Sequence, residues 1–255
     1  MWHYFFIKTP FIIPAYNEES RIEATLRCLP KDLVEPIVAV NGSTDQTAML
    51  AKEYGCAVNI LPEQGKLPAI QATLRELGDR ALEPLMILDA DTRPMIPHLW
   101  LYGMLRSLTN KGPDVPEAAG GPVWFTNGTV VNSTIRSLER MGRAVRTRSS
   151  KDASKVGQCG PNMGLHLKNK TTLENILALD HYWPSEDRAM INTVLSHGGH
   201  LAQPTKPSVL ALTYYSSSFL PLSVIKKIGR EEARAITFND YVRRGAPGSK
   251  PFVLN

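Results

Sequence analysis

Short apolar runs alternate with amphipathic stretches along the first half of the chain, and this alternation limits the folds available to it. The apolar runs occupy residues 11–13, 37–40, 58–61, 85–88 and 118–125. Helix-like segments of about ten residues lie between them, at 20–29, 44–54, 67–77 and 98–108. Strands that alternate with helices predict βαβ units and a parallel sheet. We therefore expect an α/β fold with a Rossmann-like, mostly parallel sheet and helices on both faces.

The length and composition are compatible with a single globular domain spanning residues 1–255. A chain of 255 residues buries roughly 70–75% of its unfolded surface, so its core needs no disulfides. Cys28, Cys56 and Cys159 are widely spaced, which argues against a disulfide scaffold or a thiolate zinc site. A Gly/Pro-rich stretch at 111–122 divides a nucleotide-binding half, about residues 1–110, from an acceptor-side half with a helical tail, about 111–255. We expect both halves to share one sheet.

Polar residues follow three of the apolar runs, at 14–19, 41–45 and 89–92. Ligands of open α/β sheets bind beyond the carboxyl ends of the strands, so these residues predict a binding edge. Asp89 and Asp91 project to the same side if the backbone is extended there. Two such carboxylates favour Mg²⁺ or Mn²⁺, although solvated aspartates in a strand-end turn are an equally simple interpretation. An aspartate-based phosphatase is disfavoured because Arg93 occupies the fifth position of the D-x-D motif.

Two further segments have both a structural and a functional interpretation. Residues 41–45 form a strand-to-helix turn in which Gly42 permits close backbone approach and Ser43, Thr44 or Asp45 can cap the helix. The single glycine does not support an NAD-type loop. Tyr16 and Glu18 are either ordinary strand-end residues or a stacking face and a ribose ligand.

Other charged residues are ambiguous when taken alone. Lys66 follows a glycine and can neutralise a phosphate, but no P-loop motif surrounds it. Glu186 and Asp187 open a helical stretch, as helix caps or as a general base. Arg136, Arg140 and Arg143 share a helical face, which is either solvated or a site for an anionic acceptor or membrane surface. Nucleic acid is disfavoured because aromatic residues are not interleaved. Residues 1–8 lack the form of a signal peptide and are expected to lead into a strand, and the uncharged run 208–225 is expected to be too polar to cross a bilayer.

The set of motifs, in this order, resembles a family 2 glycosyltransferase of the GT-A type. The resemblance runs over residues 11–195 and rests on F-I-I-P-A-Y-N-E-E, V-N-G-S-T-D, G-K, I-L-D-A-D-T and S-E-D. It implies a nucleotide-sugar donor, most readily a UDP- or GDP-sugar, and a divalent Mn²⁺ or Mg²⁺ ion. The residues it places at the donor are Pro14, Tyr16, Glu18, Asn41, Lys66, Asp89 and Gly160.

The same resemblance implies roles for the remaining acidic residues. Asp91 is the expected metal ligand, with Asp89 facing the metal or the ribose. Asp187 is the expected catalytic base, with Glu186 orienting the acceptor. Gly160 belongs to a loop, 157–162, that lines the junction of donor and acceptor. Asn41 leaves the nucleotide preference open because the family more often has aspartate there.

The reaction that the resemblance implies is an inverting transfer of one sugar. The Q-x-x-R-W motif of processive synthases is missing, so repeated polymerisation is not expected. A sugar-nucleotide nucleotidyltransferase and a non-catalytic nucleotide-sugar-binding protein remain as alternatives. The former would show a glycine-rich phosphate loop where residues 16–19 stand. We expect a cytoplasmic protein, with lipid-linked or anionic glycans as candidate acceptors and peripheral membrane contact through the three arginines.

Overall fold

The computed structural model describes residues 8–109, 112–121, 123–126, 162–180, 186–202, 204 and 211–214. The first half alternates strands and helices as predicted. Its strands are β1 (Thr9–Ala15), β2 (Val34–Asn41), β3 (Ala57–Leu61), β4 (Leu85–Leu88) and β5 (Thr92–Pro94). Its helices are α1 (Ile22–Arg27), α2 (Thr47–Glu53), α3 (Lys66–Leu77), the 3₁₀ turn η2 (Gly78–Leu82) and α4 (Pro97–Ser107).

The second half contributes further strands and two described helices. The strands are β6 (Glu117–Gly120), β7 (Val123–Thr126), β8 (Asn162–His166), β9 (His200–Ala202) and β10 (Ala211–Tyr214). The helices are α6 (Lys170–Leu177) and α7 (Glu186–Ser196). Among the helices described, none combines the length and the apolar character needed to cross a membrane.

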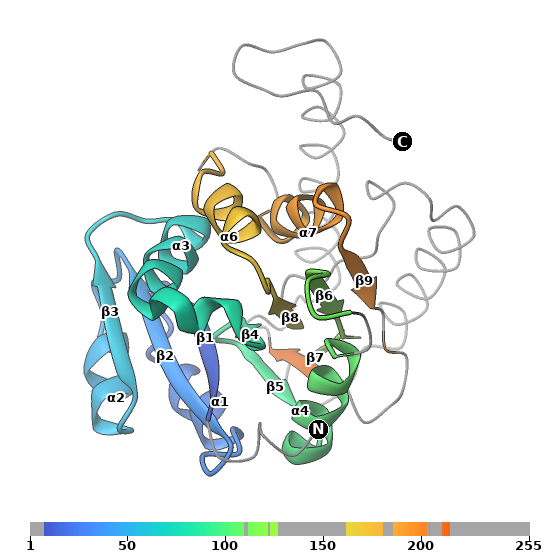
Figure 1. Cartoon of the computed structure of the whole chain (residues 1–255). Helices are drawn as coiled ribbons and strands as arrows, with labels where there is room; N and C mark the ends of the chain where they lie inside the picture. The colour runs from blue at the N-terminus through green and yellow to red at the C-terminus, as the bar shows by residue number, and fades with distance from the viewer. Residues whose placement is uncertain are drawn as a thin grey trace.

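A seven-stranded sheet with the order β3-β2-β1-β4-β8-β6-β9 forms the centre of the fold (Figure 1). Strand β8 runs antiparallel to both of its neighbours, and the other pairings are parallel. This arrangement confirms the predicted mostly parallel sheet. Since β6, β8 and β9 come from the second half, it also confirms that the two halves share one sheet.

The apolar run 118–125 was expected to form one strand, and this prediction is wrong. The chain leaves the large sheet after β6, and β7 joins a separate three-stranded sheet of order β5-β10-β7. The backbone N–H of Gly121 donates at 3.0 Å to the carbonyl of Asn162, the first residue of β8, and the pairing with β8 stops there. Residue 122 is proline, which has no N–H to offer a ladder, so continuous pairing through this point is disfavoured.

Two hydrophobic clusters fill the space on the two faces of the large sheet. One contains Phe11 and Ile13 with side chains of α1, α2 and α4, including the fully buried Trp100. The other contains Ile12 with side chains of α3, α6 and α7. Successive residues of β1 thus enter opposite clusters, as the two faces of a strand require. Helices therefore cover both faces, which confirms the predicted layering.

Candidate active site

The carboxyl ends of β1, β2 and β4 meet at one edge of the sheet, and β8 begins there because Asn162 is paired with Leu88. Lys66, the first residue of α3, connects this edge to α7. Its Nζ lies 2.6 Å from Asp89 Oδ1 and 2.9 Å from Glu186 Oε1. Each of these three side chains is about one-quarter exposed. Three predicted site residues from separate elements are thus brought together where a ligand can reach them.

The two carboxylates around Lys66 control its charge. Burial lowers the pKa of Lys66, but attraction to Asp89 and Glu186 outweighs it and raises the pKa well above its ordinary value. Burial raises the pKa of Asp89 to about 6, with Lys66 lowering it and Asp91 raising it. Lys66 is therefore a permanent cation, whereas Asp89 is a carboxylate that a nearby cation would help to ionise.

Asp89 and Asp91 lie in a tight turn rather than in the extended backbone that we expected. Strand β4 ends at Leu88, and the Thr92 N–H donates to the Asp89 carbonyl at 2.9 Å. The turn is fixed from α1, where Thr25 Oγ1 donates to the Ala90 carbonyl at 2.6 Å. The two carboxylates have different partners, yet they remain close enough for Asp91 to raise the pKa of Asp89.

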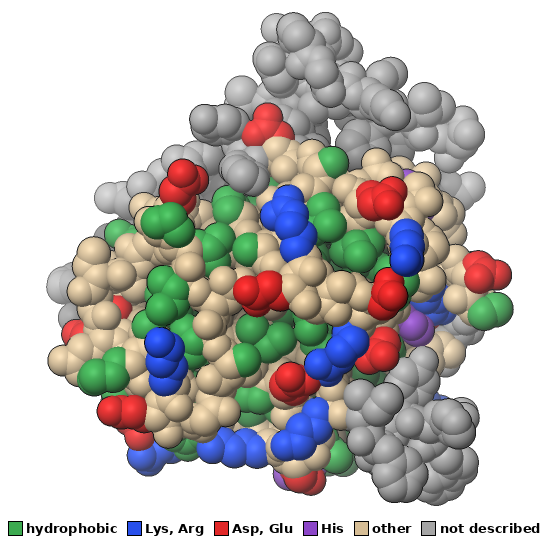
Figure 2. Space-filling model, turned by 60° about the vertical axis from the view of Figure 1, so that its left-hand side comes forward, with side chains coloured by type: hydrophobic (Ala, Val, Ile, Leu, Met, Phe, Trp, Pro, Cys, Tyr) green, Lys and Arg blue, Asp and Glu red, His purple; other side chains and the backbone are tan. Residues whose placement is uncertain are grey.

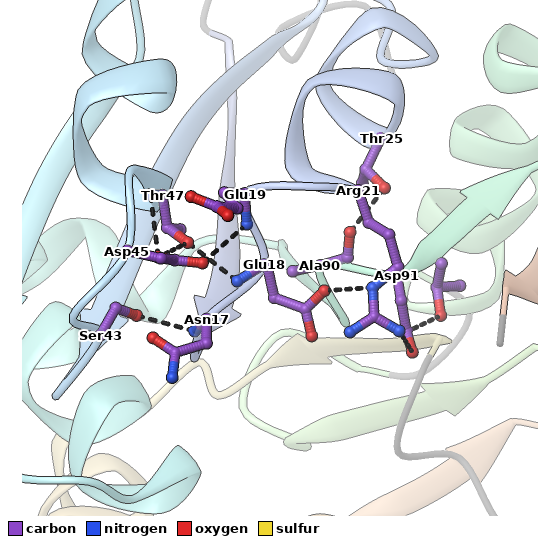
Figure 3. A network of polar contacts seen from close by, with 11 residues as sticks. Asn17, Glu18, Glu19, Arg21, Thr25, Ser43, Asp45, Thr47, Ala90 and Asp91 are labelled. Atoms are coloured by element: carbon purple, nitrogen blue, oxygen red, sulfur yellow. Dashed lines mark hydrogen bonds and ion pairs between the residues drawn. The ribbon is translucent and has the colours of Figure 1, made fainter. Parts of the chain in front are cut away.

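Arg21 lies between Glu18 and Asp91 (Figure 3). Its Nε is 2.6 Å from Glu18 Oε2, and its Nη1 is 3.9 Å from Asp91 Oδ2. Burial raises the pKa of Glu18 to about 7, Arg21 lowers it, and Asp91 and Asp89 raise it further. The sequence reasoning did not single out Arg21. The available signal was its position three residues after Glu18, directly before a helix.

The loop after β1 is fastened to the loop after β2 by hydrogen bonds (Figure 3). The N–H groups of Asn17, Glu18 and Glu19 donate to Ser43 Oγ, Thr47 Oγ1 and Asp45 Oδ2, respectively, at 3.0, 2.8 and 3.0 Å. The serine and aspartate of the N-G-S-T-D motif therefore hold the backbone that carries Glu18. Asp45 also accepts from the Thr47 N–H at 3.0 Å. The N-cap residue of α2 is Gln46, however, and not one of the three residues expected to cap the helix.

Gly42 has a left-handed φ of +72°. A Cβ on this residue would lie 3.1 Å from the backbone nitrogen of Gln64. This contact confirms the predicted close backbone approach. The loop before Lys66 therefore lies directly against the backbone that follows β2. A residue larger than glycine at position 42 would displace this loop, the end of β2, or both.

The other predicted residues differ in their accessibility. Tyr16 is 42% exposed, whereas Asn41 is 3% exposed and Asp187 7% exposed. Pro14 is buried within β1, next to Ala15 at the strand end. Asp187 lies in the first turn of α7, directly after Glu186. Gly160, its loop from 157 to 161, and the arginines at 136, 140 and 143 lie outside the described residues.

The edge carries more negative than positive side chains. Lys66 and Arg21 lie among five carboxylates, those of Glu18, Asp89, Asp91, Glu186 and Asp187. Asp89 Oδ1 and Glu18 Oε2 are buried and accept no well-formed hydrogen bond from the described residues, so each relies on an ion pair. Acidic and basic side chains are interspersed over the face shown in Figure 2. The excess of carboxylates therefore favours a cation at this edge.

The donor set fits one class of metal site. The described residues contain no group of three or more His, Cys, Asp or Glu side chains arranged to hold a metal ion, so a protein cage is not built from them. Mg²⁺ and related ions are commonly held by one or two carboxylates, with phosphate oxygens and water as the other ligands. Asp91 and Asp89 fit that requirement.

A buried hydrogen bond between Trp100 and Asn162, which the sequence did not reveal, stabilises the strand end next to this edge. Trp100 Nε1, on α4, donates to Asn162 Oδ1 at 2.9 Å, and both side chains are fully buried. Because Asn162 is paired with Leu88, this bond ties α4 to the strand end that leads into Asp89.

Comparison with known proteins places these observations in a family. The family model described as Glycosyl transferase family 2 matches residues 11–167. A comparison with curated proteins finds no match. Among solved structures, glucosyl-3-phosphoglycerate synthase from Mycobacterium tuberculosis with Mn²⁺, uridine diphosphate and glucosyl-3-phosphoglycerate is similar, at TM-score 0.57 and 18% identity, covering 95% of this chain and 81% of that one.

The same enzyme with Mn²⁺ and uridine-diphosphate-glucose gives a TM-score of 0.56 at 18% identity, with coverage of 95% and 80%. At this identity the likeness shows the GT-A fold alone. The family model, by contrast, covers more than half of the chain. The protein therefore belongs to glycosyltransferase family 2.

Proposed function

We propose that this protein transfers a single sugar from a nucleotide-sugar donor to an acceptor hydroxyl, with inversion and with a divalent metal ion bound. One observation carries the proposal: Lys66 is paired with both Asp89, at the predicted donor edge, and Glu186, beside the predicted base. Donor and acceptor chemistry would thus meet within one cluster of ion pairs.

The donor would lie across the ends of β1 and β2. The exposed ring of Tyr16 offers a stacking face for a base, and Glu18 follows two residues later in the same loop. Lys66 supplies a cation for the diphosphate, and the nearly buried Asn41 can present only its edge to the base. The similar solved structures are complexes with UDP or UDP-glucose, which supports a UDP-sugar, with a GDP-sugar as the other candidate.

Asp91, assisted by Asp89, would hold Mn²⁺ or Mg²⁺. When bound, such an ion stabilises the negative charge that grows on a departing diphosphate. No carboxylic acid is then needed to protonate the leaving group, in contrast to a glycosidase, which usually uses two carboxyl groups. One general base is enough for direct displacement.

Asp187 would be that base. The acceptor oxygen would form a bond to the anomeric carbon while the bond to the diphosphate breaks, and its proton would pass to Asp187. Glu186, one residue earlier in the first turn of α7, would orient the acceptor. Lys66 would hold Glu186 against the donor edge.

The acceptor is proposed to be anionic, and the reaction cytoplasmic. A similar solved structure, glucosyl-3-phosphoglycerate synthase from Mycobacterium tuberculosis, is a complex with phosphoglyceric acid. In this chain, Thr126 and Asn162 flank the segment that contains Arg136, Arg140 and Arg143. Asn162 is paired with Leu88, and Thr126 with Tyr214, next to the Thr213–Thr92 pair. The described residues on both sides of that segment are thus close to the Asp89–Thr92 turn, and we propose that its arginines bind the anionic acceptor.

A thermal-shift screen of UDP-, GDP- and dTDP-sugars with and without Mn²⁺ tests the donor. We expect one nucleotide class to stabilise the protein only with Mn²⁺, and Asp91→Ala to abolish that shift. Asp187→Asn should bind the donor normally while transfer falls by about 10²–10⁴-fold. Asp79→Asn removes a carboxylate from an exposed pair with Lys170. It is the matched control and should change neither donor binding nor transfer. If the donor binds equally well without Mn²⁺ and to Asp91→Ala, Asp91 does not hold a metal ion that the donor requires.

A further inference from the structure

Arg21 is a cation at the donor edge to which the family resemblance assigns no role. We propose that Arg21 is a positioning residue that takes the place of the metal ion beside Asp91 in the free chain, and thereby makes metal binding depend on the donor. This inference rests on the proposed function, because it assigns Asp91 to the metal.

The guanidinium contacts two carboxylates from different loops (Figure 3). Its Nε is 2.6 Å from Glu18 Oε2, and its Nη1 is 3.9 Å from Asp91 Oδ2. The exposed fractions of Arg21, Glu18 and Asp91 are 24%, 15% and 19%. Charges that are partly buried are screened less than fully exposed ones. The positive charge of Arg21 therefore affects the binding of any other cation to Asp91.

The backbone fixes this arrangement. The N–H groups of Arg21 and Ile22 both donate to the Glu18 carbonyl, at 2.9 and 2.8 Å. The Thr25 N–H donates to the Arg21 carbonyl at 3.2 Å, while its Oγ1 donates to the Ala90 carbonyl at 2.6 Å. Thr25 thus ties the turn that carries Asp91 to the start of α1. The approach of Arg21 to Asp91 is therefore built into the fold.

A divalent ion on Asp91 would lie within a few ångströms of the guanidinium and would be repelled by it. At about 5 Å and with the dielectric constant of water, a single and a double positive charge weaken each other's binding by roughly 10-fold. A nucleoside diphosphate brings the negative charge that both cations can share. Metal and nucleotide should therefore strengthen each other's binding, and by the same factor in either order.

The alternative is that Arg21 only pairs locally with Glu18, as Arg27 pairs with Glu23 one turn later. Arg27 is 66% exposed and provides a matched control on the same helix. In the local alternative, removing the charge of Arg21 leaves metal affinity unchanged. In our proposal it raises the affinity for metal alone.

The test is a titration with Mn²⁺, in which free Mn²⁺ is followed by electron paramagnetic resonance, with and without UDP and against a blank of UDP alone. For Arg21→Gln without UDP, we expect Mn²⁺ to bind about 10-fold more tightly than to the wild type. With UDP the difference should shrink, so the coupling between Mn²⁺ and UDP falls. Arg21→Lys should stay near the wild type, and Arg27→Gln should match it.

Urea unfolding of each variant checks that it is folded, and Arg21→Met gives the same comparison if Arg21→Gln is not. Equal or weaker binding of Mn²⁺ to the charge-deleted variant without UDP overturns the role of Arg21. If the wild type itself binds no Mn²⁺ saturably even with UDP, the proposed function fails instead. The two failures are therefore distinguishable.

Discussion

Replacing Glu18 by glutamine should stabilise the protein at alkaline pH, even though it removes an ion pair with Arg21. Burial and the neighbouring Asp91 and Asp89 raise the pKa of Glu18 from 4.5 to about 7, despite the opposing effect of Arg21. The folded chain therefore keeps this proton after the unfolded chain has lost it. As the pH rises from about 4.5 to 7, the wild type loses stability, and a variant that mimics the protonated side chain does not.

The expected magnitude follows from the size of the shift. One pKa unit corresponds to about 1.4 kcal/mol, so the rise from 4.5 to about 7 corresponds to about 3 kcal/mol of unfolding free energy. The side chain of Glu18 is only 15% exposed, so solvent screening removes little of this. The difference in stability between Glu18→Gln and the wild type should therefore grow by about 3 kcal/mol between pH 4 and pH 8.

Urea unfolding at several pH values, with chelator present to exclude metal ions, measures this difference. Glu23→Gln, on the exposed side of α1 and paired with Arg27, is the control and should show little change with pH. A Glu18→Gln effect that is the same at pH 4 and pH 8 would refute the reasoning. So would a variant that becomes less stable, relative to the wild type, as the pH rises.

Three further substitutions test contacts that stabilise the fold, each by urea unfolding. Gly42→Ala should cost about 1–2 kcal/mol for its left-handed φ plus the contact with Gln64, whereas Gly55→Ala, with φ +78° and open space around it, should cost only the former. If the two substitutions lower the unfolding free energy equally, the close approach of Gly42 to Gln64 does not contribute to the cost. Lys168→Met leaves the fully buried Glu117 without its 2.8 Å partner and should cost about 3–5 kcal/mol, most of which Lys168→Met with Glu117→Leu should restore. Trp100→Phe should cost about 1–3 kcal/mol, and no loss would mean that its bond to Asn162 contributes nothing.

The sheet and its helices were predictable because burial on two faces leaves a periodic signal. Phe11, Ile12 and Ile13 are all buried, in two different clusters, so the run reads as a strand covered on both sides. The same signal failed at 118–125, where the apolar run continues across a change of sheet. Apolar character reports that residues are buried, and it does not report against which layer.

The site was predictable only as a set of chain positions at strand ends. That Lys66 joins Asp89 to Glu186 depends on the packing of α3 and α7, which no local pattern encodes. The turn after Asp89 is held at Ala90 by Thr25, a residue 65 positions earlier in the chain. Arg21 went unnoticed for the same reason, since its importance comes from the distant Asp91 and not from its own sequence neighbours.

The turn from Asp89 to Thr92 joins two sheets, and this has a consequence for the order in which the protein is assembled. Strand β4, before the turn, pairs with β1 as soon as the first half has folded. Strand β5, after the turn, finds its one partner among the described strands in β10, at residues 211–214. Contacts between such distant segments form slowly. During synthesis, the β5 side of this turn therefore cannot form its pairing with β10 until residues 211–214 have emerged from the ribosome.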